Sequence, residues 1–234
     1  RPLAALATVA VFVCLAVSIT AGPAPSADAW SGPTRAIDAN TTPRSSSPGL
    51  LTPAGSKLFT VTSDTDALWA IAQGGAVTRL TDFGGITPRM AHVPSRDGVV
   101  VFTKFSIGVG TELWRSDGTV AGTRLVRDIR PGASSSSPNW LTQYRGDVYF
   151  TANDGTDGTE LWRTDGDQAW LVADLNSGAA SSSPANLTVV AHEATDERLW
   201  MIASSPAGTP DRLVVYNGNE HETASIDLGG RPTG

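Results

Sequence analysis

The chain of 234 residues contains a single cysteine, Cys14, and only three histidines. One cysteine forms no disulfide within the chain, so a hydrophobic core must hold the fold together. The histidines His92, His192 and His221 show no metal-ligand spacing such as H-E-x-x-H. A G-x-S-x-G elbow and a phosphate-binding glycine loop are also missing. We therefore predict no catalytic residue.

Charged residues are scarce as well, at 17%, and the net charge is -6. Nucleic-acid binding needs a basic stripe, and none is visible, so nucleic acid is excluded as an expected partner. Apolar residues at helical spacing are absent after the first 29 residues, which argues against a helical fold. What is plentiful is glycine (24) and proline (15), which favours many short strands joined by turns.

The one long apolar run extends from Leu3 to Ile19 and follows Arg1 and a proline. Small residues follow and end in Ala27-Asp28-Ala29. A positive start, an apolar middle and small residues at positions -3 and -1 predict a secretory signal peptide, residues 1–29, cleaved near Ala29. A membrane anchor is the alternative, but a run of about 17 residues is at the short end of what spans a bilayer. We expect a secreted or cell-surface protein with no membrane span in the mature chain.

Two markers recur along the rest of the chain. One is a small polar run that ends in proline, at Pro48, Pro88, Pro138 and Pro184. The other is an aspartate before a large apolar residue, at Asp82, Asp128, Asp174 and Asp227, spaced by 46, 46 and 53 residues. Such a period indicates a repeat architecture. The markers divide the chain into a Ser/Thr/Pro-rich linker (30–47) and four units, 48–87, 88–137, 138–183 and 184–234.

The third unit shows the internal layout of a repeat most clearly. Its sequence predicts short strands at 140–142, 147–152, 160–163 and 169–173, with a tight turn at Asp165-Gly166. Four short strands with turns every 8–12 residues are typical of a propeller blade. We predict an all-β fold, a β-propeller or partial propeller of four repeats. A two-sheet sandwich would not need a regular repeat.

Large apolar residues are expected at fixed positions of each blade. The position in the second strand is expected to hold Phe59, Phe102, Phe150 and Trp200. The position in the third strand is expected to hold Trp69, Trp114, Trp162 and Val214. An aromatic side chain buries about 150–250 Å². Both sets are therefore predicted to pack blade against blade in the core.

The segments Thr111–Thr119 (TELWRSDGT) and Thr159–Gly166 (TELWRTDG) resemble the ELWxxDGT repeat. The resemblance covers about 48–234, strongly in the second and third units and weakly in the other two. It implies an exported bacterial protein built from several such repeats. It adds no catalytic residue.

The acidic residues of the repeat have expected structural roles. Asp117 and Asp165, each before a glycine, are expected to bond backbone N–H groups in turns. The aspartates that end the fourth strands are expected to cap backbone amides of the linker to the next blade. Glu112 and Glu160 are expected to form exposed pairs with a neighbouring arginine, such as Arg115 or Arg163, which contribute about 0–1 kcal/mol.

The best candidate for a ligand site is the loop that contains Asp154, Asp157 and Glu160. Three carboxylates within seven residues could hold a hard cation such as Ca²⁺. A solvated hairpin loop is the alternative, because the spacing is not that of an EF-hand and the second unit lacks two of the acids. No cofactor other than calcium is expected.

The predicted function is a binding or interaction scaffold for an unknown protein or glycan at the cell surface or outside the cell. The alternative is a secreted propeller hydrolase or lyase that acts on a polysaccharide with acids at a central channel. The chain begins at Arg1 rather than Met, and four blades is the lower limit for propellers. We therefore expect a fragment of a longer repeat array.

Overall fold

The computed structural model describes residues 48–62, 66–86, 88–191, 197–204, 211–218 and 223–227. The predicted signal peptide (1–29) and linker (30–47) lie outside these residues and stay predictions. Cys14, His192 and His221 also lie outside them. Every regular element in the described ranges is a β-strand. No helix long and apolar enough to cross a membrane occurs in them.

Sixteen strands form four sheets, and in each sheet strands that follow one another in sequence pair antiparallel. The first sheet comprises β1 (Pro48–Ala54), β2 (Lys57–Thr62), β3 (Ala67–Ala72) and β4 (Val77–Asp82). The second comprises β5 (Met90–His92), β6 (Val100–Ser106), β7 (Gly110–Ser116) and β8 (Arg124–Arg127). The third comprises β9 (Asn139–Tyr144), β10 (Asp147–Asn153), β11 (Thr159–Thr164) and β12 (Ala169–Ala173). The fourth comprises β13 (Ala185–Ala191), β14 (Glu197–Ala203), β15 (Arg212–Tyr216) and β16 (Thr223–Asp227).

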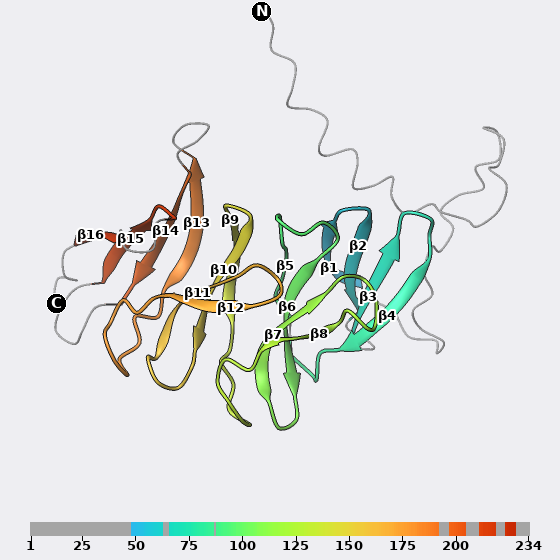
Figure 1. Ribbon diagram of the computed structural model, residues 1–234, viewed down its shortest axis with the longest axis horizontal. Coiled ribbons are helices and arrows are strands. Elements are labelled where there is room, and N and C mark those ends of the chain that lie inside the picture. The colour runs from blue at the N-terminus through green and yellow to red at the C-terminus, as the bar shows by residue number, and fades with distance from the viewer. Residues whose placement is uncertain are drawn as a thin grey trace, which may run out of the picture.

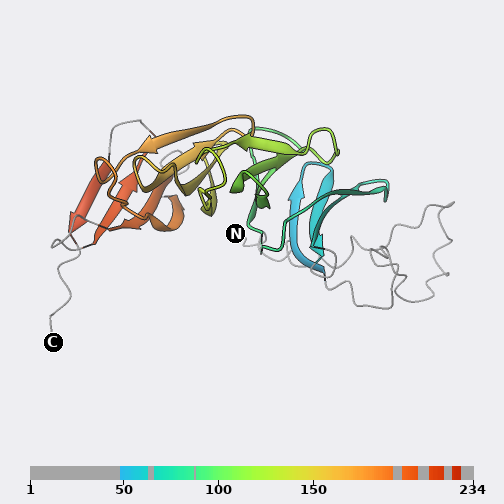
Figure 2. The same ribbon diagram turned by 90° about the horizontal axis from the view of Figure 1, so that it is seen from below.

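The sheets stand side by side along an open arc, with the first and fourth at opposite ends (Figures 1 and 2). Between sheets, the first strands contact one another in order: β1 with β5, β5 with β9, and β9 with β13. The first strands therefore lie where the sheets converge, as the innermost strands of propeller blades do. The prediction of an all-β, partial propeller of four repeats with four short antiparallel strands each is confirmed.

Three apolar clusters fill the spaces between neighbouring sheets. In each of the first three units, the leucine before the motif tryptophan packs toward the next sheet, and Leu68, Leu113 and Leu161 are at most 1% exposed. The tryptophan itself faces the preceding sheet, as Trp114 and Trp162 do. Side chains alternate between the two faces of a strand, so one Leu-Trp pair serves two interfaces.

The predicted position in the second strand is wrong for two of its four residues. Phe102 pairs with Trp114 and Phe150 pairs with Trp162, but the residue that pairs with Trp69 is Thr60, and Met201 pairs with Val214. Phe59 lies one residue before Thr60, and Trp200 lies one residue before Met201. Each therefore points to the face opposite to the one that Phe102 and Phe150 take in their sheets. The reason is the two-residue period of a strand, because a slip of one residue reverses every side chain.

Candidate functional site

The motif glutamates bind the linkers that join one sheet to the next. Glu160 is 0% exposed, and its two oxygens accept hydrogen bonds from Leu175 N at 2.9 Å, from Ser182 N at 2.6 Å and from the Ser182 hydroxyl. Glu112, also 0% exposed, accepts the equivalent bonds, which include 2.7 Å from Ser136 N. Burial raises the pKa of both carboxyls, and the serine and backbone donors oppose that rise.

This arrangement overturns the prediction that the motif glutamates form exposed pairs with arginine. The ion-pair partner of Arg115 is Asp167, and that of Arg163 is Asp147 at 3.4 Å. Both glutamates are buried instead, and each faces the linker that follows its own sheet. A buried carboxylate needs several donors to offset its desolvation, and the linker supplies them.

The same linkers also bond the following sheet. Asn153 N donates to Ser136 O at 2.9 Å, and Ser204 N donates to Ser182 O at 2.6 Å. Each serine is therefore bound on one side by the motif glutamate of its own unit and on the other by a residue at or just after the end of the second strand of the next. The glutamate thus orders the joint between two sheets rather than a ligand site.

In the second and third units, the aspartates that end the fourth strands cap backbone amides of the following linker, as predicted. Gly132 N donates to Asp128 at 3.3 Å, and Gly178 N donates to Asp174 at 3.0 Å. In the first unit, Asp82 pairs with a lysine of the next sheet at 3.4 Å instead. The side chain of the fourth unit's aspartate lies outside the described residues.

The predicted Asp-Gly turn is confirmed, and it has a second role. Asp165 accepts bonds from Asp167 N and Gln168 N at 2.9 Å each, and Gly166 has a φ of +92°. Arg96 of the second unit also donates to the backbone oxygen of Asp165 at 2.6 Å and to its carboxylate at 2.7 Å. Although burial opposes it, the Gln168 amide and the Arg96 guanidinium hold the pKa of Asp165 below its usual value.

The predicted calcium ligands lie in different surroundings. Asp154 accepts bonds from Thr156 N and Asp157 N at 2.8 Å each, whereas Glu160 is directed into the linker. Desolvation and the charges of Asp154 and Asp174 raise the pKa of Asp157. No group of three or more His, Cys, Asp or Glu side chains within the described ranges is arranged to hold a metal ion. Calcium binding stays a prediction.

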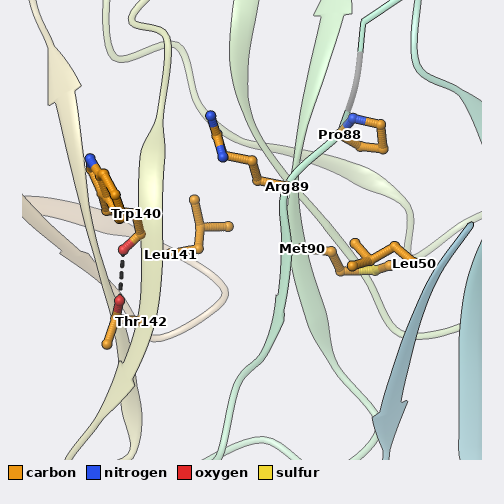
Figure 3. Close-up of a pocket in the computed structure, with 7 residues that line it drawn as sticks. All are labelled: Leu50, Pro88, Arg89, Met90, Trp140, Leu141 and Thr142. Atoms are coloured by element: carbon orange, nitrogen blue, oxygen red, sulfur yellow. Dashed lines mark hydrogen bonds between the residues drawn. The ribbon is translucent and has the colours of Figure 1, made fainter. Parts of the chain in front are cut away.

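A groove of about 330 Å³ lies between the first strands of three successive sheets. Figure 3 shows its lining, with Leu141 between Trp140 and Arg89. The described residues that line it are Leu50 from β1, Pro88, Arg89 and Met90 at β5, and Trp140, Leu141 and Thr142 from β9.

Trp140 is the most unusual residue of the groove. It is 39% exposed, and its φ is +55° at a bulge where the pairing of β9 with β10 shifts register. Its backbone is fixed on both sides, because its N–H donates to the Asn139 side chain at 2.7 Å and its carbonyl accepts from the Thr142 hydroxyl at 2.9 Å. The counterpart in the fourth unit is Asn186, with a φ of +57°. Asparagine tolerates this conformation, whereas a bulky residue is strained in it.

Arg89 supplies the positive charge of the groove. Its backbone is anchored to β6, because Arg89 N donates to the Thr103 hydroxyl at 2.9 Å and Thr103 N donates to Arg89 O at 3.0 Å. Its side chain is exposed, and no carboxylate in the described ranges pairs with it. Leu50, which is 42% exposed, and Met90 add apolar surface on the far side of Arg89. The groove therefore offers an aromatic ring, aliphatic surface and an unpaired cation.

Sequence reasoning missed this groove, although a signal was present. Leu50, Met90 and Trp140 each lie two residues after a marker proline, and Asn186 occupies that place in the fourth unit. A large apolar residue at the same offset in three units would have indicated a shared surface. The interpretation as core would still have been natural, because only the structure shows that this offset faces the inner side of the arc.

Comparisons with known proteins identify no family. No family model matches the chain, and no curated protein matches it. Among solved structures, a nidogen/laminin complex is similar at 17% identity over 68% of this chain, with a TM-score of 0.40. A gluconolactonase from Xanthomonas campestris is similar at 16% identity over 78% of this chain, with a TM-score of 0.44. The chain spans 60% and 63% of the lengths of these two proteins.

Proposed function

We propose that the chain is a binding scaffold, and that the groove between β1, β5 and β9 takes a ligand with an apolar face and an anionic group. The observation that carries this proposal is that the exposed Trp140, held in a strained bulge, and the unpaired guanidinium of Arg89 line the same groove. Tryptophan, tyrosine and arginine are enriched among the residues that dominate binding energy at interfaces. Arginine also matches a carboxylate or phosphate group with two parallel hydrogen bonds.

Strain in the Trp140 backbone supports a role in binding. A non-glycine residue in the left-handed region costs about 1–3 kcal/mol, and such residues cluster at functional sites. A bulge re-aims the side chain it carries. Here the bulge carries a large, 39% exposed side chain that lines the groove, at a place where asparagine would be less strained. A fold that needed only the bulge would not need the tryptophan.

The proposal includes export and membership of the ELWxxDGT-like repeat proteins. The apolar run before Ala29 supports export, and the two TELW segments support the repeat family. A ligand outside the cell, either a protein or a glycan, is consistent with both. The alternative of a polysaccharide hydrolase or lyase has no comparable support, because none of the described residues that line the groove carries a carboxyl, imidazole or thiol group.

We expect Trp140→Asn and Arg89→Gln each to weaken ligand binding at least about tenfold, because each removes one of the two anchoring groups. The measurement is binding of the purified chain to an array of uronic acid oligosaccharides and of peptides with a free terminal carboxylate. Binding to one of these two sets identifies the ligand as a glycan or as a protein. Trp140→Asn should not lower the melting temperature, because asparagine relieves the strain at this position.

Trp170 provides a matched control. It lies on β12, is 36% exposed, and its ring packs against Arg163 at 5.2 Å, so Trp170→Asn removes a tryptophan of nearly equal exposure outside the groove. We expect this variant to bind as the wild type does. If Trp140→Asn bound as well as Trp170→Asn, or if neither set of array ligands bound the wild type, the groove would not be the binding site.

A further inference from the structure

One packing rule holds at each of the three junctions between neighbouring sheets. The motif leucine of one sheet and the residue at the motif tryptophan position of the next sheet meet in one apolar cluster. Leu161 of the third sheet and Val214 of the fourth, for example, meet in this way at 1% exposed each. Because the same contact recurs, apolar packing by itself does not distinguish one junction from another.

A second contact recurs at the Asp-Gly turns of the second and third units. Lys57 Nζ of the first sheet donates to the backbone oxygen of Asp117 at 2.8 Å, and Arg96 Nε of the second unit donates to that of Asp165 at 2.6 Å. Each basic residue lies at, or directly after, the connection between the first two strands of its unit. A backbone oxygen is the same in every turn, so this contact does not distinguish the junctions either.

Asp167 differs from this pattern, because the second unit has Thr119 in its place. The Thr119 hydroxyl is used inside its own turn, where it donates to Asp117 at 2.7 Å and accepts from Gly122 N at 2.9 Å. Asp167 keeps the role of its backbone in the turn, since its N–H donates to Asp165 at 2.9 Å. Its carboxylate, in contrast, bonds the second sheet. The acid is therefore a feature of the junction and not of the turn.

Three arginines of the second unit pair with the Asp167 carboxylate. Arg96 lies 2.6 Å from one oxygen, Arg124 lies 2.7 Å from the other, and Arg115 also bonds this second oxygen. The Arg115 side chain is only 11% exposed, and its Nε has no hydrogen-bond partner among the described residues. A buried cation that loses its carboxylate is strongly destabilising, so Arg115 depends on Asp167.

The pair of Arg115 and Arg124 occurs in only one of the four described sheets. The two residues are cross-strand partners on β7 and β8. The equivalent partners are Ala70 and Thr78 in the first sheet, Arg163 and Trp170 in the third, and Val215 and Ala224 in the fourth. Two arginines that face an acidic turn are thus confined to the junction between the second and third sheets.

We propose that Asp167, Arg115 and Arg124 form a specificity element, which selects the third sheet as the partner of the second when the repeats assemble. Against the first sheet, the Asp167 carboxylate would meet Ala70 and Thr78 and lose two of its three cations. Against the second sheet, a turn with threonine in place of Asp167 would leave Arg115 partly buried without a carboxylate. Interfaces with similar apolar faces gain specificity when wrong pairings are penalised in this way. The proposal depends neither on the groove nor on the number of repeats in the array.

Two variants separate selection from simple stabilisation. Asp167→Thr breaks the element and leaves Arg115 without its carboxylate. The triple variant Asp167→Thr, Arg115→Met, Arg124→Thr removes the whole element, and methionine keeps most of the volume of the Arg115 side chain. We expect Asp167→Thr to lower the melting temperature by about 5 °C and the triple variant to lower it by less, because replacing a complete ion cluster costs less than breaking it.

Refolding measures the selection itself. The purified chain is unfolded in urea, refolded by dilution at micromolar concentration and analysed by size-exclusion chromatography against protein that was never unfolded. We expect the triple variant to give a share of misassembled species at least about threefold larger than the wild type does, because misassembly is the characteristic failure of repeat proteins. Arg163→Gln is the control. It removes an ion pair with Asp147 inside the third sheet, and Arg163 is 35% exposed where Arg96 is 36% exposed.

The control variant should refold as the wild type does. The proposal would be overturned by a triple variant that refolds as cleanly as the wild type, or by an Arg163→Gln variant that misassembles as often as the triple variant. A triple variant that melts below Asp167→Thr would also overturn it, because the charges would then serve stability and not selection.

Discussion

Replacing Glu160 with glutamine is expected to lower the free energy of unfolding by about 3 kcal/mol, because a carboxylate with two accepting oxygens becomes an amide with one. Both oxygens of Glu160 are used, by Leu175 N and by the amide and hydroxyl of Ser182. The NH₂ group of glutamine would face one of these N–H donors in a site that is 0% exposed. Loss of the negative charge also weakens the remaining bonds.

The measurement is urea unfolding followed by tryptophan fluorescence, with Glu197→Gln as the control. Glu197 is exposed at the start of β14, and its replacement should change the stability by less than about 0.5 kcal/mol. Amide hydrogen exchange gives a local test, because Ser204 N bonds the carbonyl of Ser182 and should exchange faster in the Glu160→Gln variant. Equal unfolding midpoints for the two variants would contradict the role assigned to Glu160.

The repeat made the strands and turns predictable, because these depend on local patterns. Asp165-Gly166 was identified as a turn, and the predicted strand 169–173 coincides with β12. The partner of the motif glutamate was not predictable in the same way. Ser182 lies 22 residues after Glu160, beyond a strand and a turn, and their contact depends on how the linker folds back. Because Arg163 lies close to Glu160 in the sequence, the prediction paired the two, and this partner was wrong.

Register is a second limit of reasoning from the repeat. Phe59 and Phe102 both lie in second strands and are both buried, so counting aromatic residues places them together. Strand pairing shows instead that Thr60 is the counterpart of Phe102. The residue types of the second strand fit either Phe59 or Thr60 as the counterpart of Phe102. They differ only in which face each residue takes, and this depends on the hydrogen bonds to the neighbouring strand.

The groove shows a third limit. Its residues come from three units, and their convergence depends on the contacts of β1 with β5 and of β5 with β9. The left-handed backbone of Trp140 is equally invisible in sequence, since tryptophan is among the residues least expected there. Features of this kind follow from the arrangement of sheets and not from any one repeat.

Trp162→Ala is expected to lower the free energy of unfolding by about 4 kcal/mol, because it leaves a cavity in the cluster between the second and third sheets. Trp162 is 3% exposed, its cross-strand partner is the buried Phe150, and the guanidinium of Arg127 lies 5.5 Å from the centre of its ring. Trp170→Ala on the neighbouring strand β12 removes the same atoms from a side chain that is 36% exposed. It should cost less than about 1 kcal/mol.

The two alanine variants test the packing rule itself, because Trp162 and Trp170 lie on adjacent strands of one sheet and differ mainly in the surface they face. Urea unfolding midpoints measure both stabilities under the same conditions. If the motif tryptophan joins each sheet to the one before it, loss of Trp162 weakens the contact between the second and third sheets, and the molecule loses cooperativity there. Equal costs for the two variants would mean that the tryptophan stabilises its own sheet rather than the interface.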